Sequence, residues 1–378
     1  MTDDVPLFEI PWDRPELTNV VDSITRGSYW ANGPYIGRFE DRIQKFLGAE
    51  NAVVFNSGTT ALTSALRAHG IGEGDEVIVP SFTFISTANS VRLTGAEPVF
   101  ADIERERYGL DPESVADVVS DDTAAIVPVH YAGCPCSLPA LQDVASDHDL
   151  LLIEDAAEAF GATLDGSKVG TYGDSAMLSF CQNKVVATGE GGAVVTDDDD
   201  LATELRLLRS HGRASADYFE STGSGAYASL GNNFRMPDMV AALGVGQLDR
   251  VAELIEGRRR AASEYADRLA DIDGIEPMTD PENGRHVYQL FTVTLDPDFD
   301  RDAIAKSLAE AGVSSKVYFE PVHRSRYYRN TYGRPVDHLQ VTEAVSERVL
   351  SLPMHPELTS EEIDHVVDAL TTSIEADG

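Results

Sequence analysis

One lysine stands in a stretch of this sequence that could do chemistry. Lys184 follows the apolar run Met177-Leu178 and precedes the glycine-rich turn Gly189-Glu190-Gly191-Gly192, so its amine should project from a short loop beyond a buried strand. Only five of the 29 lysines and arginines are lysines. An amine can lose its proton and form a Schiff base, which a guanidinium cannot do. Lys184 is therefore a candidate for covalent catalysis; the alternative is a surface lysine that extends its amine into water.

A second loop could bind an anion. Asn56-Ser57-Gly58-Thr59-Thr60 follows the first apolar run and precedes a helical pattern that begins near Ala61. Hydroxyl groups, a glycine that allows close backbone approach and the free amides of a helix N-terminus suit a phosphate. Ser57 or Thr59 could instead cap the helix and satisfy the same amides. The loop lacks the lysine of a Walker A motif, which disfavours nucleoside triphosphate hydrolysis.

Carboxylates end a third apolar run, Leu151-Leu152-Ile153-Glu154-Asp155. A carboxylate at the buried end of a strand is costly unless it meets a cation, a metal or several donors. Asp155 is therefore a candidate partner for a protonated ring nitrogen. Glu154 could equally hold that place, and an acid here could also simply favour the dipole of a following helix.

The elements that would position these groups are short apolar runs that alternate with helix-period segments. The runs lie at residues 53–55, 77–79, 99–100, 125–127, 151–153, 177–178 and 193–195, and the helical segments include 61–69, 86–93 and 138–146. Buried strands joined by helices predict an α/β fold with a mostly parallel seven-stranded sheet. Ligands of such sheets bind at the carboxyl ends of the strands, where the three loops should meet.

The pattern changes after about residue 245. We expect a large domain over residues 1–245, with an N-terminal arm, and a smaller C-terminal α/β domain over residues 246–378. A helical stretch from Pro237 through Arg260 should connect them. Further expected elements are an exposed loop at 27–34, a helix over 39–46, segments at 287–293 and 314–318, and a helical tail over 360–374.

Composition narrows the classes of function. The formal net charge of −35 disfavours nucleic acid as a partner, because a phosphate backbone would be repelled. Acidic excess with few lysines predicts a halophilic protein. The chain has no bilayer-length apolar stretch and no signal-peptide pattern, so we expect a cytoplasmic protein without a membrane partner. Cys134, Cys136 and Cys181 match neither a redox pair nor a zinc site, and the run Asp197-Asp198-Asp199-Asp200 predicts solvated surface, so no metal site is expected.

Together, the three loops suit one cofactor. A phosphate-binding loop, a carboxylate at a strand end and a loop lysine, in this order on a parallel α/β sheet, are the parts that pyridoxal phosphate requires. The lysine would carry the aldehyde, and the carboxylate would keep the ring nitrogen protonated so that the ring accepts electrons. The loop that begins at Asn56 would hold the phosphate.

The chain resembles the DegT/StrS type of nucleotide-sugar aminotransferases, which are fold-type I pyridoxal phosphate enzymes. The similarity runs over nearly the whole length, and the motifs that carry it are Phe39-Glu40, Asn56-Ser57-Gly58-Thr59, Gly74-Asp75-Glu76-Val77-Ile78, Pro80-Ser81-Phe82-Thr83-Phe84, Glu154-Asp155-Ala156-Ala157, Ser179-Phe180 with Lys184, Gly189-Glu190-Gly191-Gly192, Asn233-Phe234-Arg235-Met236 and Leu350-Ser351-Leu352-Pro353.

This resemblance implies roles for individual residues. Lys184 matches the lysine that forms the Schiff base with the cofactor, and Asp155 matches the partner of the pyridine nitrogen. Glu158 matches the position that faces the ring oxygen, which is Gln or His in many relatives. The implied catalytic residues are Lys184 and Asp155, and the expected cofactor-binding set is Ser57, Gly58, Thr59, Phe84, Asp155, Glu158, Ser179, Lys184 and Asn233.

Within that set, Phe84 matches the aromatic residue that stacks on the ring. Gly58, Thr59 and Ser179 match phosphate contacts. Asn233 matches an asparagine that reaches the phosphate from the other subunit, which implies a homodimer with shared active sites. Side chains that could contact the substrate are Tyr29, Trp30, Arg213, Arg235, Tyr318 and His323.

The implied function is a pyridoxal phosphate-dependent sugar aminotransferase in polysaccharide or glycan biosynthesis. It would take an amino group from glutamate and pass it to the keto group of a nucleotide-activated sugar. Some relatives are nucleotide-sugar dehydratases in which histidine replaces the lysine, and Lys184 argues against that alternative. A fold-type I enzyme that acts on amino acids is a second alternative, which only the family-wide motifs disfavour. A non-catalytic relative that only binds the cofactor is the third, against which Lys184 and Asp155 argue together.

Overall fold

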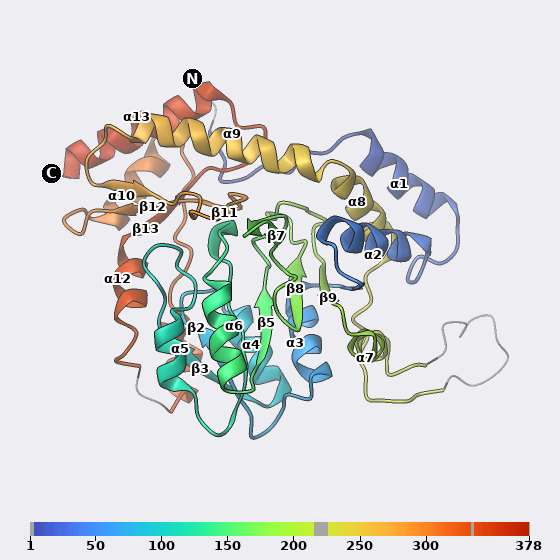
Figure 1. The fold of residues 1–378 in the computed structure, drawn as a ribbon. Helices are drawn as coiled ribbons and strands as arrows, with labels where there is room; N and C mark the ends of the chain where they lie inside the picture. Colours follow the sequence, from blue (N-terminus) through green and yellow to red (C-terminus); the bar gives the residue numbers. More distant parts are fainter. Residues whose placement is uncertain (1–3, 215–225, 334–335, 378) are drawn as a thin grey trace.

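The computed structural model describes residues 4–214, 226–333 and 336–377, and its centre is a seven-stranded sheet (Figure 1). The strand order is β1-β9-β8-β5-β4-β2-β3. The five strands from β8 to β3 are parallel, and β9 runs antiparallel to both of its neighbours. The predicted mostly parallel sheet is confirmed, because each apolar run forms one strand: β1 (Asn51–Phe55), β2 (Glu76–Pro80), β3 (Glu97–Ala101), β4 (Thr123–Ile126), β5 (Leu151–Asp155), β8 (Ser175–Ser179) and β9 (Gly192–Thr196).

The strands are apolar on both faces because helices cover both faces (Figure 1). On β1, Val54 packs into one core, and Val53 and Phe55 pack into another. Successive side chains of a strand point to opposite faces, so an unbroken apolar run is what a doubly covered sheet needs. The first core includes α2 (Pro34–Leu47), α5 (Pro112–Val118) and α6 (Leu138–Asp147), and the second includes α3 (Gly58–Ala68), α4 (Ser86–Thr94) and α7 (Asp199–Arg209).

Helices α1 (Arg14–Thr25) and α2 pack on α8 (Asp238–Asp249), so the N-terminal segment and a late helix lie side by side. The buried carboxylate of Asp238 accepts hydrogen bonds from the Ser23 hydroxyl at 2.6 Å and from the Tyr35 amide at 2.9 Å. Helix α1 was not among the predicted elements, although its capping box, formed by Asp13 and Glu16, is a sequence signal for a helix start.

Two predicted boundaries near these helices differ from the structure. Helix α2 begins at Pro34 rather than at Phe39, since proline suits the first turn of a helix. The single helical stretch predicted from Pro237 to Arg260 is two helices, α8 and α9 (Val251–Leu269), which are separated at Arg250. The predicted domain boundary at residues 245 and 246 falls inside α8, and the division into two domains stays a prediction.

A second, three-stranded antiparallel sheet forms a core of its own with α9, α10 (Arg301–Glu310) and α13 (Ser360–Asp377). Its strands are β10 (Ile275–Pro277), β12 (Phe291–Leu295) and β13 (Val349–Leu352). The predicted helical tail is confirmed by α13. Smaller elements complete the chain: β6 (Thr163–Leu164), β7 (Ser167–Lys168), β11 (Gly284–Arg285), α11 (Arg326–Thr331), α12 (Gln340–Arg348) and the 3-10 turns Tyr131–Gly133 and Val322–Arg324.

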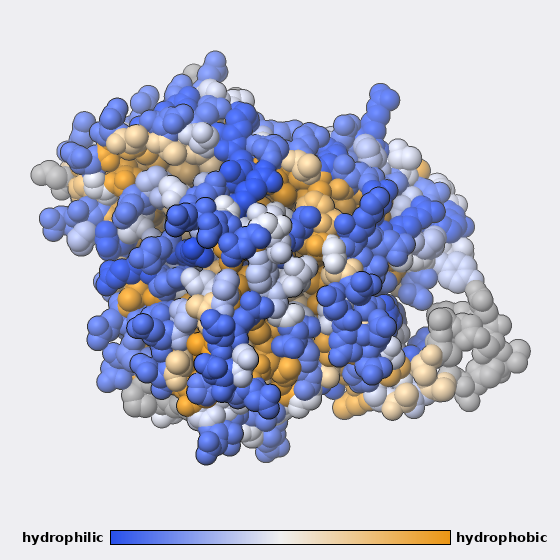
Figure 2. Space-filling view, viewed as in Figure 1, coloured by the Kyte–Doolittle hydropathy of each residue, from blue (hydrophilic) through white to orange (hydrophobic). Residues whose placement is uncertain are grey.

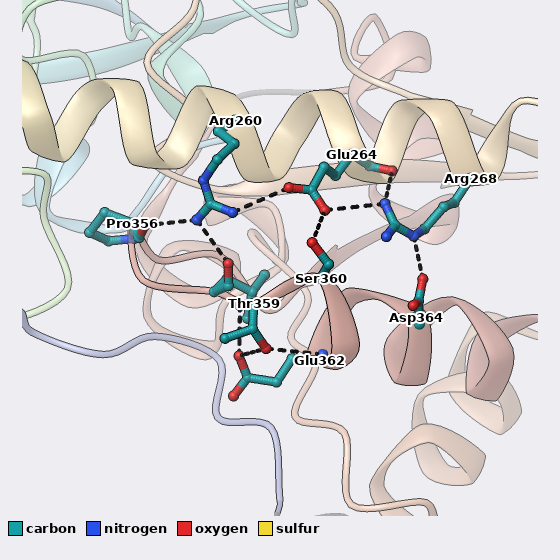
Figure 3. A network of polar contacts seen from close by, with 9 residues as sticks. Arg260, Glu264, Arg268, Pro356, Thr359, Ser360, Glu362 and Asp364 are labelled. Atoms are coloured by element: carbon teal, nitrogen blue, oxygen red, sulfur yellow. Dashed lines mark hydrogen bonds and ion pairs between the residues drawn. The ribbon is translucent and has the colours of Figure 1, made fainter.

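Charged side chains join α9 to the start of α13 on the surface (Figure 3). Glu264 accepts hydrogen bonds from Arg260 at 3.2 Å, from Arg268 at 3.4 Å and from the Ser360 hydroxyl at 2.7 Å, and Arg268 also pairs with Asp364. Hydrophilic residues dominate the face of the molecule in Figure 2, in keeping with the net charge of −35. None of the helices in the described ranges combines the length and the hydrophobicity that a membrane span needs.

Candidate active site

A cavity of about 450 Å³ opens where the strands β5 and β8 end, and eight of the nine predicted cofactor-binding residues line it. They come from the loops after four strands, which is why a parallel sheet brings them together. The eight residues are Ser57, Gly58, Thr59, Phe84, Asp155, Glu158, Ser179 and Lys184. The ninth, Asn233, is exposed and does not line the cavity of its own chain.

Lys184 lies in the loop between β8 and β9, and its side chain is 14% exposed. Its Nζ atom donates a hydrogen bond to Oε1 of Glu158 at 3.1 Å. The other oxygen of Glu158, Oε2, accepts a hydrogen bond from the backbone amide of Ala132 at 2.8 Å. The Lys184 amine is thus paired with a carboxylate that a backbone amide holds in place. Lys184 is therefore not a solvated surface lysine.

Glu154 and Asp155 are neighbours on β5, but they point to opposite faces of the sheet. The fully buried Glu154 accepts hydrogen bonds from His130 Nε2 at 3.1 Å and from the backbone amides of Gly170, Tyr172 and Gly173 at 2.8 to 2.9 Å. Because the amide of Cys136 donates to His130 Nδ1, the ring proton lies on Nε2. Burial raises the Glu154 pKa, but the His130 contact and these amides outweigh it, and the pKa lies below its usual value.

Asp155 faces the cavity instead. Its two oxygens accept hydrogen bonds from the Thr87 hydroxyl at 2.9 Å and from the Ala157 amide at 3.2 Å. Burial raises the pKa of Asp155, against the opposing effects of those two donors and of Lys184. A carboxylate can accept about four hydrogen bonds, so Asp155 keeps capacity for a further donor from the cavity, and Glu154 keeps none.

The loop after β1 caps a helix, which was one of the two alternatives for this loop, and it also lines the cavity. Ser57 is the N-cap of α3 and accepts a hydrogen bond from the Thr60 amide at 3.2 Å. A Cβ atom on Gly58 would lie 3.2 Å from Cβ of Ser179, and one on Gly192 would lie 2.5 Å from the Ser57 carbonyl oxygen. Glycine at both positions therefore lets this helix start lie close against β8 and β9. The first turn of α3 and the hydroxyls of Thr59 and Ser179 line the same end of the cavity.

Pyridoxal phosphate fits this donor set. Lys184 supplies the amine, Asp155 a buried acceptor with spare capacity, and the start of α3 an anion site, all within one cavity. The volume lies in the range typical of small-molecule sites, roughly 300 to 1,000 Å³. Phe84 offers an aromatic face to the cavity and remains 60% exposed.

The predicted substrate residues are only partly brought together. Tyr318 lines the cavity, and burial raises its pKa. His323 does not line it; its Nδ1 atom lies 2.7 Å from the Ser81 hydroxyl, and burial lowers its pKa. The other candidates, Tyr29, Trp30, Arg213 and Arg235, also lie outside the residues that line the cavity.

Gln289 was missed by sequence reasoning, yet it contacts the Lys184 loop. Its buried amide donates a hydrogen bond to the carbonyl of Asn183. The backbone carbonyl of Gln289 in turn accepts a hydrogen bond from the buried guanidinium of Arg258 at 3.3 Å. Burial lowers the pKa of Arg258 to about 10. No sequence motif marks Gln289 as a residue of this site.

Comparisons with known proteins agree over nearly the full length. The model of the DegT/DnrJ/EryC1/StrS aminotransferase family matches residues 11–371. The chain is 40% identical to GDP-perosamine synthase of Caulobacter vibrioides, over 89% of this chain and 90% of that protein. It is 36% identical to the spore coat polysaccharide biosynthesis protein SpsC of Bacillus subtilis, over 94% of both. The structure of Spr1654 from Streptococcus pneumoniae in its PLP form is similar, with a TM-score of 0.93 at 26% identity, over 99% of this chain and 100% of that one.

Proposed function

Because the chain belongs to the DegT/DnrJ/EryC1/StrS aminotransferase family, we propose that it transfers an amino group from glutamate to the keto group of a nucleotide-activated sugar. The chain is a pyridoxal phosphate-dependent aminotransferase, as its sequence predicts. The observation that carries the proposal is the position of Lys184 and Asp155 on the walls of one cavity that also contains the start of α3.

The proposed roles follow from the geometry. When bound, pyridoxal phosphate supplies an aldehyde and an electron-accepting ring. Lys184 would hold the cofactor covalently, and its amine, when free, would serve as the group that moves a proton at the reacting carbon atoms. Asp155 would accept a hydrogen bond from the ring nitrogen and would favour the protonated form of that atom. Glu158 orients the Lys184 amine, and the first turn of α3 binds the phosphate.

We also propose a homodimer with shared active sites. This is supported by Asn233, which is exposed and does not line the cavity of its own chain, so its proposed phosphate contact would be made in the cavity of a second copy. Arg235 lies two residues further on and donates a hydrogen bond to Ser210. Asn233→Ala should weaken pyridoxal phosphate binding. In a dimer of one wild-type and one Asn233→Ala chain, one cofactor site should stay intact, so the contribution of each chain to cofactor binding can be measured separately.

The setting of the enzyme is part of the same proposal. We propose a cytoplasmic enzyme of amino-sugar synthesis for polysaccharide or glycan assembly, with a large and a small domain that divide near residue 245. Three free cysteines suit a reducing compartment. The net charge of −35 supports adaptation to high salt, which predicts that the urea midpoint of unfolding rises with potassium chloride concentration. An unchanged midpoint would contradict that adaptation.

The function is tested in two half-reactions. Glutamate added to the loaded enzyme should abolish the absorbance of the lysine-bound cofactor and release 2-oxoglutarate. A panel of nucleotide keto-sugars, with GDP- and UDP-linked members, should then restore the absorbance for one of them. Loss of water from the sugar without consumption of glutamate would instead indicate a dehydratase. No change with any amino donor would indicate a protein that only binds the cofactor.

A further inference from the structure

The cavity walls carry an uneven distribution of charge. Three carboxylates, from Asp155, Glu158 and Glu190, line it together with two ammonium groups, from Lys184 and Lys316. Lys184 is paired with Glu158 and is the point of cofactor attachment in the proposed function. Among the lining residues, all of which lie in the described ranges, Lys316 is therefore the cation that is left for a substrate.

Lys316 is held in a defined position. Its backbone amide donates to the Ser351 carbonyl at 3.0 Å, and its carbonyl accepts from the Ser351 amide at 2.9 Å, which fixes it to β13. Its Nζ atom lies 5.1 Å from the centre of the Tyr318 ring, a cation–π distance. The side chain is exposed and forms no ion pair with any carboxylate in the parts of the chain that the structure describes. Its charge is fixed in place and remains available to a ligand.

Tyr318 connects this charge to the reactive lysine. Its hydroxyl lies near the side chain of Asn183, the residue before Lys184, while its ring contacts the Lys316 ammonium. Both lysines line the cavity, but the Lys184 side chain is only 14% exposed, whereas Lys316 is exposed to solvent. We expect the nucleotide part of a sugar that reacts beside Lys184 to extend toward solvent along the wall that Tyr318 and Lys316 form.

On the basis of the proposed function, we propose that Lys316 binds a phosphate group of the nucleotide part of the substrate. An ammonium forms charge-assisted hydrogen bonds with phosphate oxygens. The overall charge of −35 would otherwise repel a nucleoside diphosphate, and Glu190 adds a further repulsive charge at this cavity. The amino donor is smaller and reacts beside the less exposed Lys184, so its carboxylates do not need to reach Lys316.

The test compares Lys316→Met with Lys316→Arg and with Lys168→Met. Lys168 is a matched control, because its Nζ atom also lies over an aromatic ring, 4.8 Å from the centre of Phe46, and it does not line the cavity. Calorimetry on the cofactor-loaded enzyme measures the binding of GDP and UDP, and absorbance measures the glutamate half-reaction. Lys316→Met should weaken the affinity about tenfold for whichever of GDP and UDP the wild-type enzyme binds more tightly. Lys316→Arg and Lys168→Met should change this affinity little. The loss of affinity in Lys316→Met should be smaller at high salt.

The glutamate half-reaction separates this inference from the proposed function. Lys316→Met should leave its rate unchanged. A variant that slows this half-reaction but binds nucleotide normally would assign Lys316 to the donor carboxylate and overturn the inference. Equal nucleotide binding by Lys316→Met and Lys168→Met, or a wild-type enzyme that binds neither nucleotide, would also overturn it. A wild-type enzyme that binds nucleotide through Lys316 but does not convert glutamate would refute the proposed function alone.

Discussion

Two polar networks in this protein place carboxylates beside hydrogen-bond donors and cations, but in different surroundings. At the end of β5 and in the loop after it, the carboxylates of Glu154, Asp155 and Glu158 are buried, and each accepts hydrogen bonds from fixed donors. Between α9 and α13, the Arg260, Glu264 and Arg268 side chains of Figure 3 remain partly exposed. Water and salt screen the second network, whereas the first is shielded from both.

The difference teaches which charges can do chemistry. Exposed ion pairs contribute little to stability, because solvation offsets most of their attraction. A buried carboxylate must instead have its hydrogen bonds satisfied, so its partners determine its role. Glu154 is saturated by four donors and is structural, whereas Asp155 keeps capacity for a ligand. Five substitutions, ordered from the largest expected effect to the smallest, test this distinction.

Lys184→Ala should reduce transamination by about 10³-fold or more, because it removes both the covalent attachment and the proton carrier. The absorbance of the lysine-bound cofactor should be lost while the circular dichroism stays unchanged. Lys168→Ala, outside the cavity, is the control and should be fully active. A Lys184→Ala variant that keeps transaminating would exclude the assignment.

Glu154→Gln should lower the free energy of unfolding by about 3 kcal/mol, because its amide group would face donors that need an acceptor. The measurement is urea unfolding at several pH values. Since folding lowers the Glu154 pKa, its contribution is present above the pKa of the unfolded chain and is lost as the pH falls through the folded pKa. The difference in the free energy of unfolding between the wild type and Glu154→Gln should therefore become smaller in acid. Glu264→Gln is the exposed control, and an equal loss there would contradict the comparison.

Asp155→Asn should slow the glutamate half-reaction by about 10²-fold, because a neutral amide cannot stabilise a protonated ring nitrogen. The fold should survive, since asparagine can still accept the Thr87 hydrogen bond. Stopped-flow absorbance measures the rate. If Asp155→Asn were fully active and a folded Glu154→Gln were inactive, the two carboxylates would have exchanged roles.

Gln289→Leu should slow turnover about tenfold, because it removes the hydrogen bond that holds the carbonyl of Asn183, beside Lys184. Gln142 is a matched control, as its amide donates to the Tyr172 carbonyl at 2.7 Å, outside the cavity. Gln142→Leu should cost about 1 kcal/mol of stability without changing the cofactor spectrum. If the pH titration of the cofactor absorbance is the same in Gln289→Leu and Gln142→Leu, Gln289 has only a packing role.

Arg268→Ala should lower the free energy of unfolding by about 0.5 kcal/mol in dilute buffer, and by less in concentrated salt. Activity should not change. The salt series of urea midpoints measures this, and a loss that grows with salt would show that the network in Figure 3 is not screened.

The sequence predicts the sheet well because strands that are buried on both faces must be apolar throughout, and seven such runs appear. Lys184 and Asp155 can be placed for a related reason, since parallel strands bring the loops at their ends to one edge. The choice between Glu154 and Asp155 needs the structure, because their donors come from residues 87, 130 and 170–173, which no local pattern connects to β5. The roles proposed for Gln289 and Lys316 could not be predicted from the sequence either, since their contacts join segments far apart in the chain.

Peptide mapping after borohydride reduction of the cofactor-loaded protein tests the central claim most directly. Reduction fixes pyridoxal phosphate to the amine that carries it, and the chain offers only five lysines. Two of them, Lys184 and Lys316, line the same cavity, so the result is informative. We predict that the label is found on Lys184 alone. A label on Lys316, or on no lysine, would contradict the assignment of Lys184 as the reactive amine.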